Sequence, residues 1–264
     1  MKKNGNWNKH DLYEESVQNP EFEVEFLRKI YKQHRRKAAK VFREDFCGTA
    51  VLCCEWARQV RNGRAIGIDL DKETLQWGEK NHLAKLGKSA SRIQLEHANV
   101  MDAKRFKADL VAALNFSYFV FKKRSELLDY YRCVHRSLNS DGVFVVDLYG
   151  GPEAQIEQEE ITEQDSGFDY VWDQAYFNPV TGETLCHIHF DLPDGTRIKK
   201  AFTYDWRLWA MPEIRDVMLD AGFKETHVYW EGTDEEDGSG NGEFEMSDQG
   251  DDAGSWVAYI VGLK

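Results

Sequence analysis

Long apolar runs are missing from this sequence of 264 residues. No stretch approaches the roughly 20 consecutive apolar residues that a membrane-spanning helix needs. The first residues, MKKNGNWNKHDLYEE, also lack an apolar core of signal-peptide length. We therefore expect a cytoplasmic protein with no membrane partner.

Cysteine is scarce, and its spacing forms no recognisable pattern. The count is five, which is odd, and the spacing matches neither a zinc site nor a disulfide framework. Reduced thiols in the cytosol are the plain interpretation, and we expect no metal centre. The five positions are Cys47, Cys53, Cys54, Cys133 and Cys186.

Positive charge is in deficit, with a formal net charge of −12. Residues 233–254 contain nine acids and no Lys or Arg, so this segment accounts for most of the imbalance. An acidic chain without a basic stripe is a poor duplex nucleic-acid binder, so we expect no nucleic-acid partner. We interpret 233–254 as a mobile acidic loop. Asp237–Asp248 partly matches a calcium loop, which is a minor alternative.

The first half of the chain alternates strands and helices. After a helix expected at Glu21–Lys37, the apolar pattern predicts strands and helices in turn. The expected strands are Val41–Phe46, Ala65–Leu70, Ile93–Ala98, Ala108–Leu114 and Val143–Tyr149. The expected helices between them are Val51–Gln59, Lys72–Leu86 and Arg124–Leu138. Continuous apolar strands separated by helices indicate a parallel sheet covered on both faces.

The second half has a different pattern. Tyr170–Phe177, Thr184–Leu192 and Arg197–Trp206 are separated by hairpin signals and predict a three-stranded antiparallel meander. A helix at Met211–Ala221 and two late strands, Thr226–Trp230 and Trp256–Gly262, then complete the sheet.

The fold class that follows is α/β, with a doubly wound, Rossmann-like, mostly parallel sheet, an antiparallel edge strand and an inserted antiparallel β meander. We divide the chain into four parts. Residues 1–40 form an N-terminal helical cap, 41–150 the Rossmann-like core, 151–206 the β insertion and 207–264 the C-terminal completion of the core. With 264 residues, one α/β domain with an insertion fits better than two domains.

The turn after the first strand is where such a sheet binds its ligand. It contains EDFCGTA, with a single glycine, Gly48, preceded by Glu44 and Asp45. A dinucleotide site would have several glycines to admit a pyrophosphate, and acids here would repel one. A cationic ligand without phosphate fits better. S-adenosylmethionine, with its sulfonium and amino groups, is such a ligand.

Further strand ends add to this hypothesis. Asp69 ends the second strand and can accept both hydroxyls of a ribose. After the third strand, Val100 and Met101 offer apolar contacts for an adenine, and Asp102 offers an acceptor for its amine. Asp102 fits equally well as the cap of a following helix. After the fourth strand, the segment from Asn115 would lie where the methyl group and its acceptor meet.

The order EDFCGTA, GIDLD, NVMD, ALNFSY, SDGVFVVDLY and a late AGF resembles the class I S-adenosylmethionine-dependent methyltransferases. The resemblance covers about 42–150 and 203–264. The glycine-rich motif of that family has an acid followed by three glycines at alternate positions. Glu44 matches the acid, Phe46 replaces the first glycine, Gly48 matches the middle one and Ala50 replaces the last. The cofactor-binding residues so predicted are Arg43, Glu44, Asp45, Phe46, Cys47, Gly48, Thr49, Asp69, Leu70, Val100, Met101, Asp102, Asn115 and Phe116. The meander looks like the lid of small-molecule N- and O-methyltransferases.

Candidates for catalysis are few, because methyl transfer mainly needs alignment and a base only when the acceptor must lose a proton. We name Tyr13, Tyr118 and His189 as candidate bases; the resemblance suggests Tyr13, since N-terminal segments often cover this site. Each has a plain alternative: His189 with His187 fits a half-exposed sheet face, and Arg43 fits a solvated basic segment.

The function predicted is N- or O-methylation of a small-molecule acceptor by a monomer or homodimer, with S-adenosylmethionine as cofactor. Two alternatives stay open. One is a non-catalytic Rossmann module that binds S-adenosylmethionine or a partner, because two motif glycines are replaced. The other is a methyltransferase acting on RNA or protein; the missing basic groove argues against RNA, whereas a protein acceptor stays open as the alternative.

Overall fold

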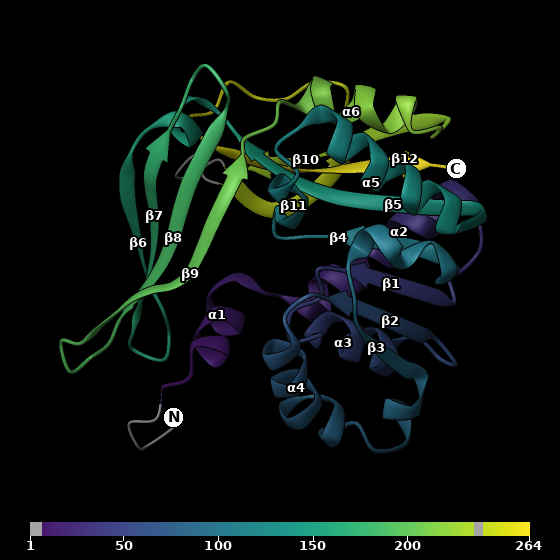
Figure 1. Cartoon of the computed structure of the whole chain (residues 1–264), viewed down its shortest axis with the longest axis horizontal. Coiled ribbons are helices and arrows are strands. Elements are labelled where there is room, and N and C mark those ends of the chain that lie inside the picture. Colours follow the sequence, from purple (N-terminus) through teal and green to yellow (C-terminus); the bar gives the residue numbers. More distant parts are fainter. Residues whose placement is uncertain (1–6, 235–239) are drawn as a thin grey trace.

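Two sheets organise the chain, which the computed structural model describes for residues 7–234 and 240–264 (Figure 1). The large sheet has the strand order β11-β10-β12-β5-β4-β1-β2-β3, and the small sheet has the order β6-β7-β8-β9. The large sheet consists of β1 (Val41–Asp45), β2 (Arg64–Asp69), β3 (Ile93–His97), β4 (Ala108–Ala113), β5 (Leu138–Gly150), β10 (Glu225–Thr233), β11 (Gly240–Met246) and β12 (Trp256–Leu263).

Strand direction in the large sheet matches the predicted class. Strands β1 to β5 pair in parallel, whereas β12 runs antiparallel to β5, β10 to β12, and β11 to β10. Because β1 lies between β2 and β4, the chain order reverses at β1 and β4, and this is the switch point where ligands bind in such sheets. The predicted mostly parallel, doubly wound sheet is therefore confirmed.

Helices cover both faces of this sheet. They are α1 (Lys9–Val17), α2 (Pro20–Arg35), α3 (Val51–Gln59), α4 (Lys72–Asn81), α5 (Arg124–Ser137) and α6 (Met211–Asp220). Short 3₁₀ helices occupy Leu83–Lys85, Gly87–Arg92, Val100–Arg105, Ser117–Val120 and Pro152–Gln155. Helices α2 and α3 share a core with one sheet face, and α5 and α6 share a core with the other. None of the described helices combines the length and apolar character needed to cross a bilayer.

Helix α2 carries the N-terminal segment over the sheet. It begins at Pro20 because the Asn19 side chain accepts a hydrogen bond from the Phe22 N–H, and a proline fits the first helical position. It ends where Arg36 adopts a left-handed conformation, with φ of 55°. Its apolar face, including Phe26 and Ile30, is buried against the sheet. The helix expected at Glu21–Lys37 is thus close to the observed one.

The insertion has one strand more than predicted. The small sheet has four antiparallel strands, β6 (Gln158–Glu163), β7 (Asp169–Phe177), β8 (Glu183–Asp191) and β9 (Arg197–Arg207), instead of three. The missed strand, β6, lies at the edge of the sheet and is mostly exposed, so it has no apolar alternation to reveal it. In Figure 1 the small sheet stands beside the large one, and α1 lies between the small sheet and α4 in this view.

The acidic segment 233–254 also needs correction. Part of it is strand β11, whose Phe244 packs against Phe26 and Tyr259 with ring centroids 5.6 and 4.8 Å apart. A strand paired to β10 cannot wrap around an ion, so residues 240–246 do not support the calcium-loop alternative. The start of that alternative, 237–239, lies outside the described residues.

Arg43 and Asp45 form a buried pair in the face of β1 that α5 covers. The Arg43 Nε lies 2.9 Å from Asp45 Oδ1, and both side chains are fully buried. Arg43 also donates hydrogen bonds to the Ser137 hydroxyl and to two backbone carbonyls, and the Tyr130 hydroxyl donates to Asp45. Such a pair is costly to break, because one partner would remain as an uncompensated charge.

We predict that Arg43→Met lowers the free energy of unfolding by about 3–5 kcal/mol, since Asp45 is left without its cation. Urea denaturation measures this. The matched control is Arg105→Met, which removes an exposed pair with Glu96 and should cost less than about 1 kcal/mol. Equal losses in the two variants would contradict the prediction.

Candidate functional site

The loop after β1 has three left-handed residues in alternation. Phe46, Gly48 and Ala50 have φ of 60°, 52° and 58°. These are the positions of the three glycines in the motif that the sequence resembles. A residue other than glycine in this conformation costs roughly 1–2 kcal/mol. Two of the three positions bear this cost, so other interactions must hold the loop.

Packing and hydrogen bonds supply that support. The Phe46 ring contacts Tyr130 with centroids 5.8 Å apart, and Ala50 is fully buried. The Gly48 N–H donates to Asp69 Oδ2 over 2.8 Å, and the Cys47 N–H donates to the Ile68 carbonyl over 3.0 Å. The loop is therefore tied to the end of β2.

Two further glycines let this loop lie close to its neighbours. A Cβ on Gly78 of α4 would lie 2.1 Å from the Thr49 carbonyl oxygen, and a Cβ on Gly67 of β2 would lie 2.8 Å from Cys47 Sγ. A Cβ on Gly48 would meet nothing within 4 Å, so the loop is open on its other side. The loop backbone is thus held on the side that faces β2 and α4, and it is accessible at Gly48.

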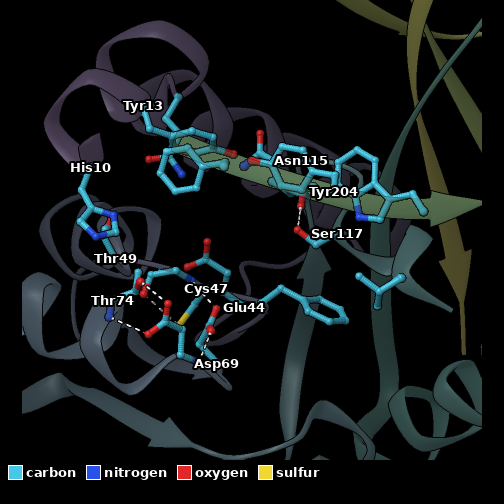
Figure 2. Close-up of a pocket in the computed structure, with 18 residues that line it drawn as sticks. His10, Tyr13, Glu44, Cys47, Thr49, Asp69, Thr74, Asn115, Ser117 and Tyr204 are labelled. Carbon is cyan, nitrogen blue, oxygen red and sulfur yellow. Dashed lines mark hydrogen bonds between the residues drawn. The ribbon is translucent and has the colours of Figure 1, made fainter. Parts of the chain in front are cut away.

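A cavity of about 310 Å³ lies over this loop. Figure 2 shows its walls: Glu44, Cys47, Thr49 and Asp69 lie on one side, and Tyr13, Asn115, Ser117 and Tyr204 on the other. The remaining lining residues are His10, Gln18, Phe46, Gly48, Asp71, Thr74, Leu114, Val120, Phe202 and Trp206. The cavity therefore lies between the switch point, helix α1 and the small sheet.

A second cavity, of about 250 Å³, adjoins the first and shares Tyr13, Asn115, Tyr204 and Trp206 with it. Its other walls are Val17, Glu23, Phe116, Asp147, Tyr170, Trp172, Ile188, Val257 and Tyr259. Because four residues border both, a ligand in one cavity can face a ligand in the other across this boundary.

The charged groups that line both cavities are acidic. Among the described lining residues none is Lys or Arg, and His10 is the one basic side chain. Burial raises the pKa of Glu44 to about 8, an effect opposed by the hydrogen bond from the Cys53 thiol. Burial also raises the pKa of Asp69, although two backbone N–H groups donate to its carboxylate. A cation entering here would meet groups that lack a counter-charge.

Helix α1 closes one side of the first cavity. Its Glu14 carboxylate accepts hydrogen bonds from the Thr49 hydroxyl over 2.5 Å and from His82 over 2.7 Å. His10 lies against Trp77 with ring centroids 5.0 Å apart, and Tyr13 lies against Phe202 at 4.9 Å. The N-terminal helix is therefore fastened both to the loop after β1 and to the small sheet.

No protein-family model and no curated protein match the sequence. Solved structures do match. A S-adenosylmethionine-dependent methyltransferase from Clostridium acetobutylicum ATCC 824 superposes with a TM-score of 0.68 at 15% identity, covering 96% of this chain and 97% of that one. DesVI from Streptomyces venezuelae gives 0.69 at 16%, covering 98% and 99%. CalS10, a S-adenosylmethionine-bound amino pentose methyltransferase from Micromonospora echinaspora, gives 0.68 at 13%, covering all of both chains.

The chain shares the fold of these methyltransferases. The match extends over the large sheet and the insertion together, since nearly the whole of each chain is covered. At these identities the likeness concerns the fold.

Within this methyltransferase fold, nine predicted residues line the cavities. Eight line the first: Tyr13, Glu44, Phe46, Cys47, Gly48, Thr49, Asp69 and Asn115. Phe116 lines the second, and Asn115 borders both. They come from α1, β1 and the loop after it, β2 and the segment after β4, so the fold gathers residues that are distant in the sequence.

Four predicted residues need correction. Arg43 and Asp45 are paired in the core and fully buried, so neither reaches a ligand. Tyr118 is fully buried, and its hydroxyl donates to the Asp147 carbonyl instead of facing a cavity. His189 lies in the small sheet between Asp173 and the Lys200 N–H, away from both cavities. Of the three candidate bases, Tyr13 alone lines them.

The adenine contacts stay predictions. Leu70 is 62% exposed at the end of β2, and Val100, Met101 and Asp102 begin the 3₁₀ helix after β3, capped by Asn99. These residues line neither cavity. The capping alternative for Asp102 is not what the structure has, because Asn99 fills that role.

Several cavity residues had no sequence signal. Gln18 and Glu23 belong to the N-terminal segment, and Tyr204 to β9, so long-range packing alone brings them to the switch point. Asp147 did have a signal, since it stands near the carboxyl end of the apolar strand VFVVDLY, where this sheet class places ligand groups.

We predict that Gly78→Ala destabilises the protein by about 1–3 kcal/mol, because the new methyl group would push the Thr49 carbonyl and the loop. The sign of this change in the free energy of unfolding is informative, because alanine in a helix normally stabilises by up to about 1 kcal/mol relative to glycine. The control is Gln76→Ala at an exposed position of the same helix, which should change stability by less than about 0.5 kcal/mol. Thermal or urea unfolding measures both, and a stabilised Gly78→Ala variant would contradict the argument.

Proposed function

We propose that this protein is a S-adenosylmethionine-dependent methyltransferase that acts on the nitrogen or oxygen of a small molecule. One observation carries the proposal: two adjoining cavities at the switch point share a four-residue boundary and contain buried acids without Lys or Arg. A methyl donor and an acceptor need such a pair of facing compartments. The first cavity would hold the cofactor, because the loop after β1 and Asp69 lie there.

The residues present fit this cofactor. A carboxylate has about four acceptor positions, and the Asp69 carboxylate uses two of them for the N–H groups of Gly48 and Asp71. Two remain for the adjacent hydroxyls of a ribose. The missing side chain at Gly48 leaves room for close approach to the backbone. The buried side-chain oxygen of Gln18, Oε1, has no hydrogen-bond partner among the described residues, and Gln18 lines the first cavity, so this oxygen is a further polar contact for a ligand.

The bound cofactor would supply a methyl group on a positively charged sulfur. The chain itself contributes alignment and exclusion of water. Helix α1 closes the first cavity, and aromatic side chains of β9 form the boundary to the second. In such a site the displacement gains from proximity and from a dry environment.

Several structural neighbours have printed functions of this kind. CalS10 is described as an amino pentose methyltransferase, and KedS8 from Streptoalloteichus sp. as a sugar N-methyltransferase. MtfA is described as a glycopeptide N-methyltransferase complexed with S-adenosylmethionine. These descriptions support a small-molecule acceptor and this cofactor for a chain of the same fold.

We predict that Asp69→Asn weakens binding of S-adenosylhomocysteine at least tenfold, which corresponds to about 1.4 kcal/mol. The amide loses the charge and half of the acceptor positions that a ribose would use, and bonds to charged groups contribute roughly 1.5–3 kcal/mol. Isothermal titration calorimetry measures the dissociation constant. Glu73→Gln, an exposed acid of the neighbouring helix, is the control and should bind as wild type does. No binding by wild type, or equal binding by Asp69→Asn, would remove the hypothesis.

A second prediction concerns pH. With its pKa raised to about 8, Glu44 is mostly protonated at pH 7 in the free protein. A bound cation favours the ionised form, so binding below pH 8 releases a proton and affinity rises between pH 6 and 8. We expect the rise in wild type and a flatter profile in Glu44→Gln. Calorimetry in two buffers with different ionisation enthalpies counts the released protons. The same slope in both proteins would show that another group is responsible.

A further inference from the structure

We propose that the acceptor is an amine, bound as its ammonium ion in the second cavity between Glu23, Asp147 and an aromatic wall of the small sheet, with Glu23 taking up its proton. This inference rests on the proposed methyltransferase function and names the substrate class of that site. It depends on four features of the second cavity: the position of its acids, their different hydrogen bonding, its aromatic wall and one unpartnered hydroxyl.

The two acids approach the cavity from different elements. Asp147 lies on β5 opposite Tyr259 of β12 in the antiparallel register, and Glu23 lies on α2, one helical turn before Phe26. The Phe26 ring packs on Tyr259 with centroids 4.7 Å apart, which places this end of α2 over Asp147 and Tyr259. Glu23, Asp147 and Tyr259 all line the second cavity.

The two carboxylates differ in their hydrogen bonds. Asp147 accepts from the N–H groups of Asn115 and Phe116 over 2.6 and 2.9 Å, so it is fixed in place. The Glu23 carboxylate accepts a hydrogen bond from the Asn19 backbone N–H, which lowers its pKa. No described side chain forms a hydrogen bond with it. Asp147 is thus a carboxylate fixed in position, and Glu23 has acceptor positions free for a ligand.

Among the described residues, none of the groups that act electrostatically on Glu23 is a cation. The groups that face it are Asp147 from β5, Tyr259 from β12, Tyr13 from α1 and Glu44 from β1. Burial and the charge of Asp147 raise the pKa of Glu23 to about 7, and burial raises that of Asp147 to about 7. An ammonium ion in the cavity would supply the missing counter-charge.

The opposite wall is aromatic. Tyr170 and Trp172 of β7 and Tyr204 and Trp206 of β9 occupy alternate positions, so they point to the same face of the small sheet. Tyr204 stacks on Trp206 with centroids 4.3 Å apart, and Trp172 lies within 6.3 Å of both. Aromatic faces attract cations and cover apolar ring surfaces. Acids on one side and aromatic faces on the other are the arrangement that an organic ammonium ion needs.

The Tyr259 hydroxyl is a separate polar group available to a ligand. Tyr259 is more than nine-tenths buried and lines the second cavity. No described residue forms a hydrogen bond with its hydroxyl, and this oxygen is not among the fully enclosed polar atoms, so it stays open to the cavity. A polar group of the acceptor, next to the ammonium held by Glu23, would satisfy it.

The reaction balances with these groups. Ionised Glu23 accepts one proton from the ammonium and frees the nitrogen lone pair. That lone pair forms the new N–C bond to the methyl carbon as the C–S bond breaks, and the electron pair of the broken bond stays on sulfur as a neutral thioether. The methylated product leaves as an ammonium ion, and the proton on Glu23 passes to water.

An amine suits this base better than an alcohol does. An alkylammonium ion has a pKa of about 10.4, so a carboxylate with a raised pKa can take its proton with a modest unfavourable step. An ordinary alcohol is a far weaker acid, and none of the described residues that line the second cavity is a histidine or a lysine. The cavity therefore selects for nitrogen.

The test uses full-length protein saturated with S-adenosylhomocysteine and two matched probe pairs, tyramine against 4-hydroxyphenethyl alcohol and glucosamine against glucose. We expect at least one amine to bind ten times more tightly than its alcohol in calorimetry. With S-adenosylmethionine, mass spectrometry should find the added methyl on that amine and not on its alcohol. No preference for an amine in either pair, or methylation of an alcohol alone, overturns the inference.

Two variants assign the preference to Glu23. Glu23→Gln should lose the tenfold preference for the amine, whereas Glu25→Gln, which removes the same charge from an exposed position of the same helix, should keep it. A second measurement needs no variant: in wild type the preference should disappear between pH 8 and pH 5, as Glu23 and Asp147 become protonated. An unchanged preference in Glu23→Gln, or at pH 5, overturns the proposal. Failure to bind S-adenosylhomocysteine at all would instead defeat the proposed function.

Discussion

Two carboxylates, one on each side of the switch point, hold the loops on which the cavities depend. Asp69 at the end of β2 accepts from Gly48 in the loop after β1, and Asp147 near the end of β5 accepts from Asn115 and Phe116 in the loop after β4. Both loops are left-handed at these positions. In each case a neighbouring parallel strand supplies the acceptor for N–H groups that no ladder pairs. The strain of the loops is therefore offset within the sheet that carries them.

The sequence predicted this architecture well, because apolar strands and helical periodicity are local signals. It also predicted where the ligand loop begins. The backbone path of that loop was left undetermined, because Phe46 and Ala50 stand where glycine is usual. The structure keeps the left-handed path at both positions. The stabilising contacts come from Tyr130, far along the chain, and from burial of Ala50, and neither can be read from a local pattern. Strand β6 and β11 were missed for the same reason: tertiary contacts, not alternation, define them.

The predicted site residues of β1 lie on opposite faces of the strand, and only those on one face reach the cavity. Successive side chains of a strand point to opposite faces, so Glu44 faces the cavity while Arg43 and Asp45 face the core under α5. Alternation alone could have separated these three residues. Glu23 and Tyr204 are different, because their place at the cavity depends on how α2 and the small sheet pack against the core. That packing involves contacts between segments separated by a hundred residues or more, and a single sequence does not reveal it.

Burial of acids without cations is the feature that joins the two cavities. Removing a carboxylate from water costs free energy unless a partner compensates, and the raised pKa values of Glu44, Glu23 and Asp147 express that cost as proton uptake. Glu23 also contributes to the shift at Glu44, so the cavities are coupled. A cation in the first cavity lets Glu44 ionise without loss, and a second cation does the same for Glu23. Each cavity is therefore suited to a positively charged ligand, and the proposed pairing of a sulfonium donor with an ammonium acceptor would compensate the acids of both.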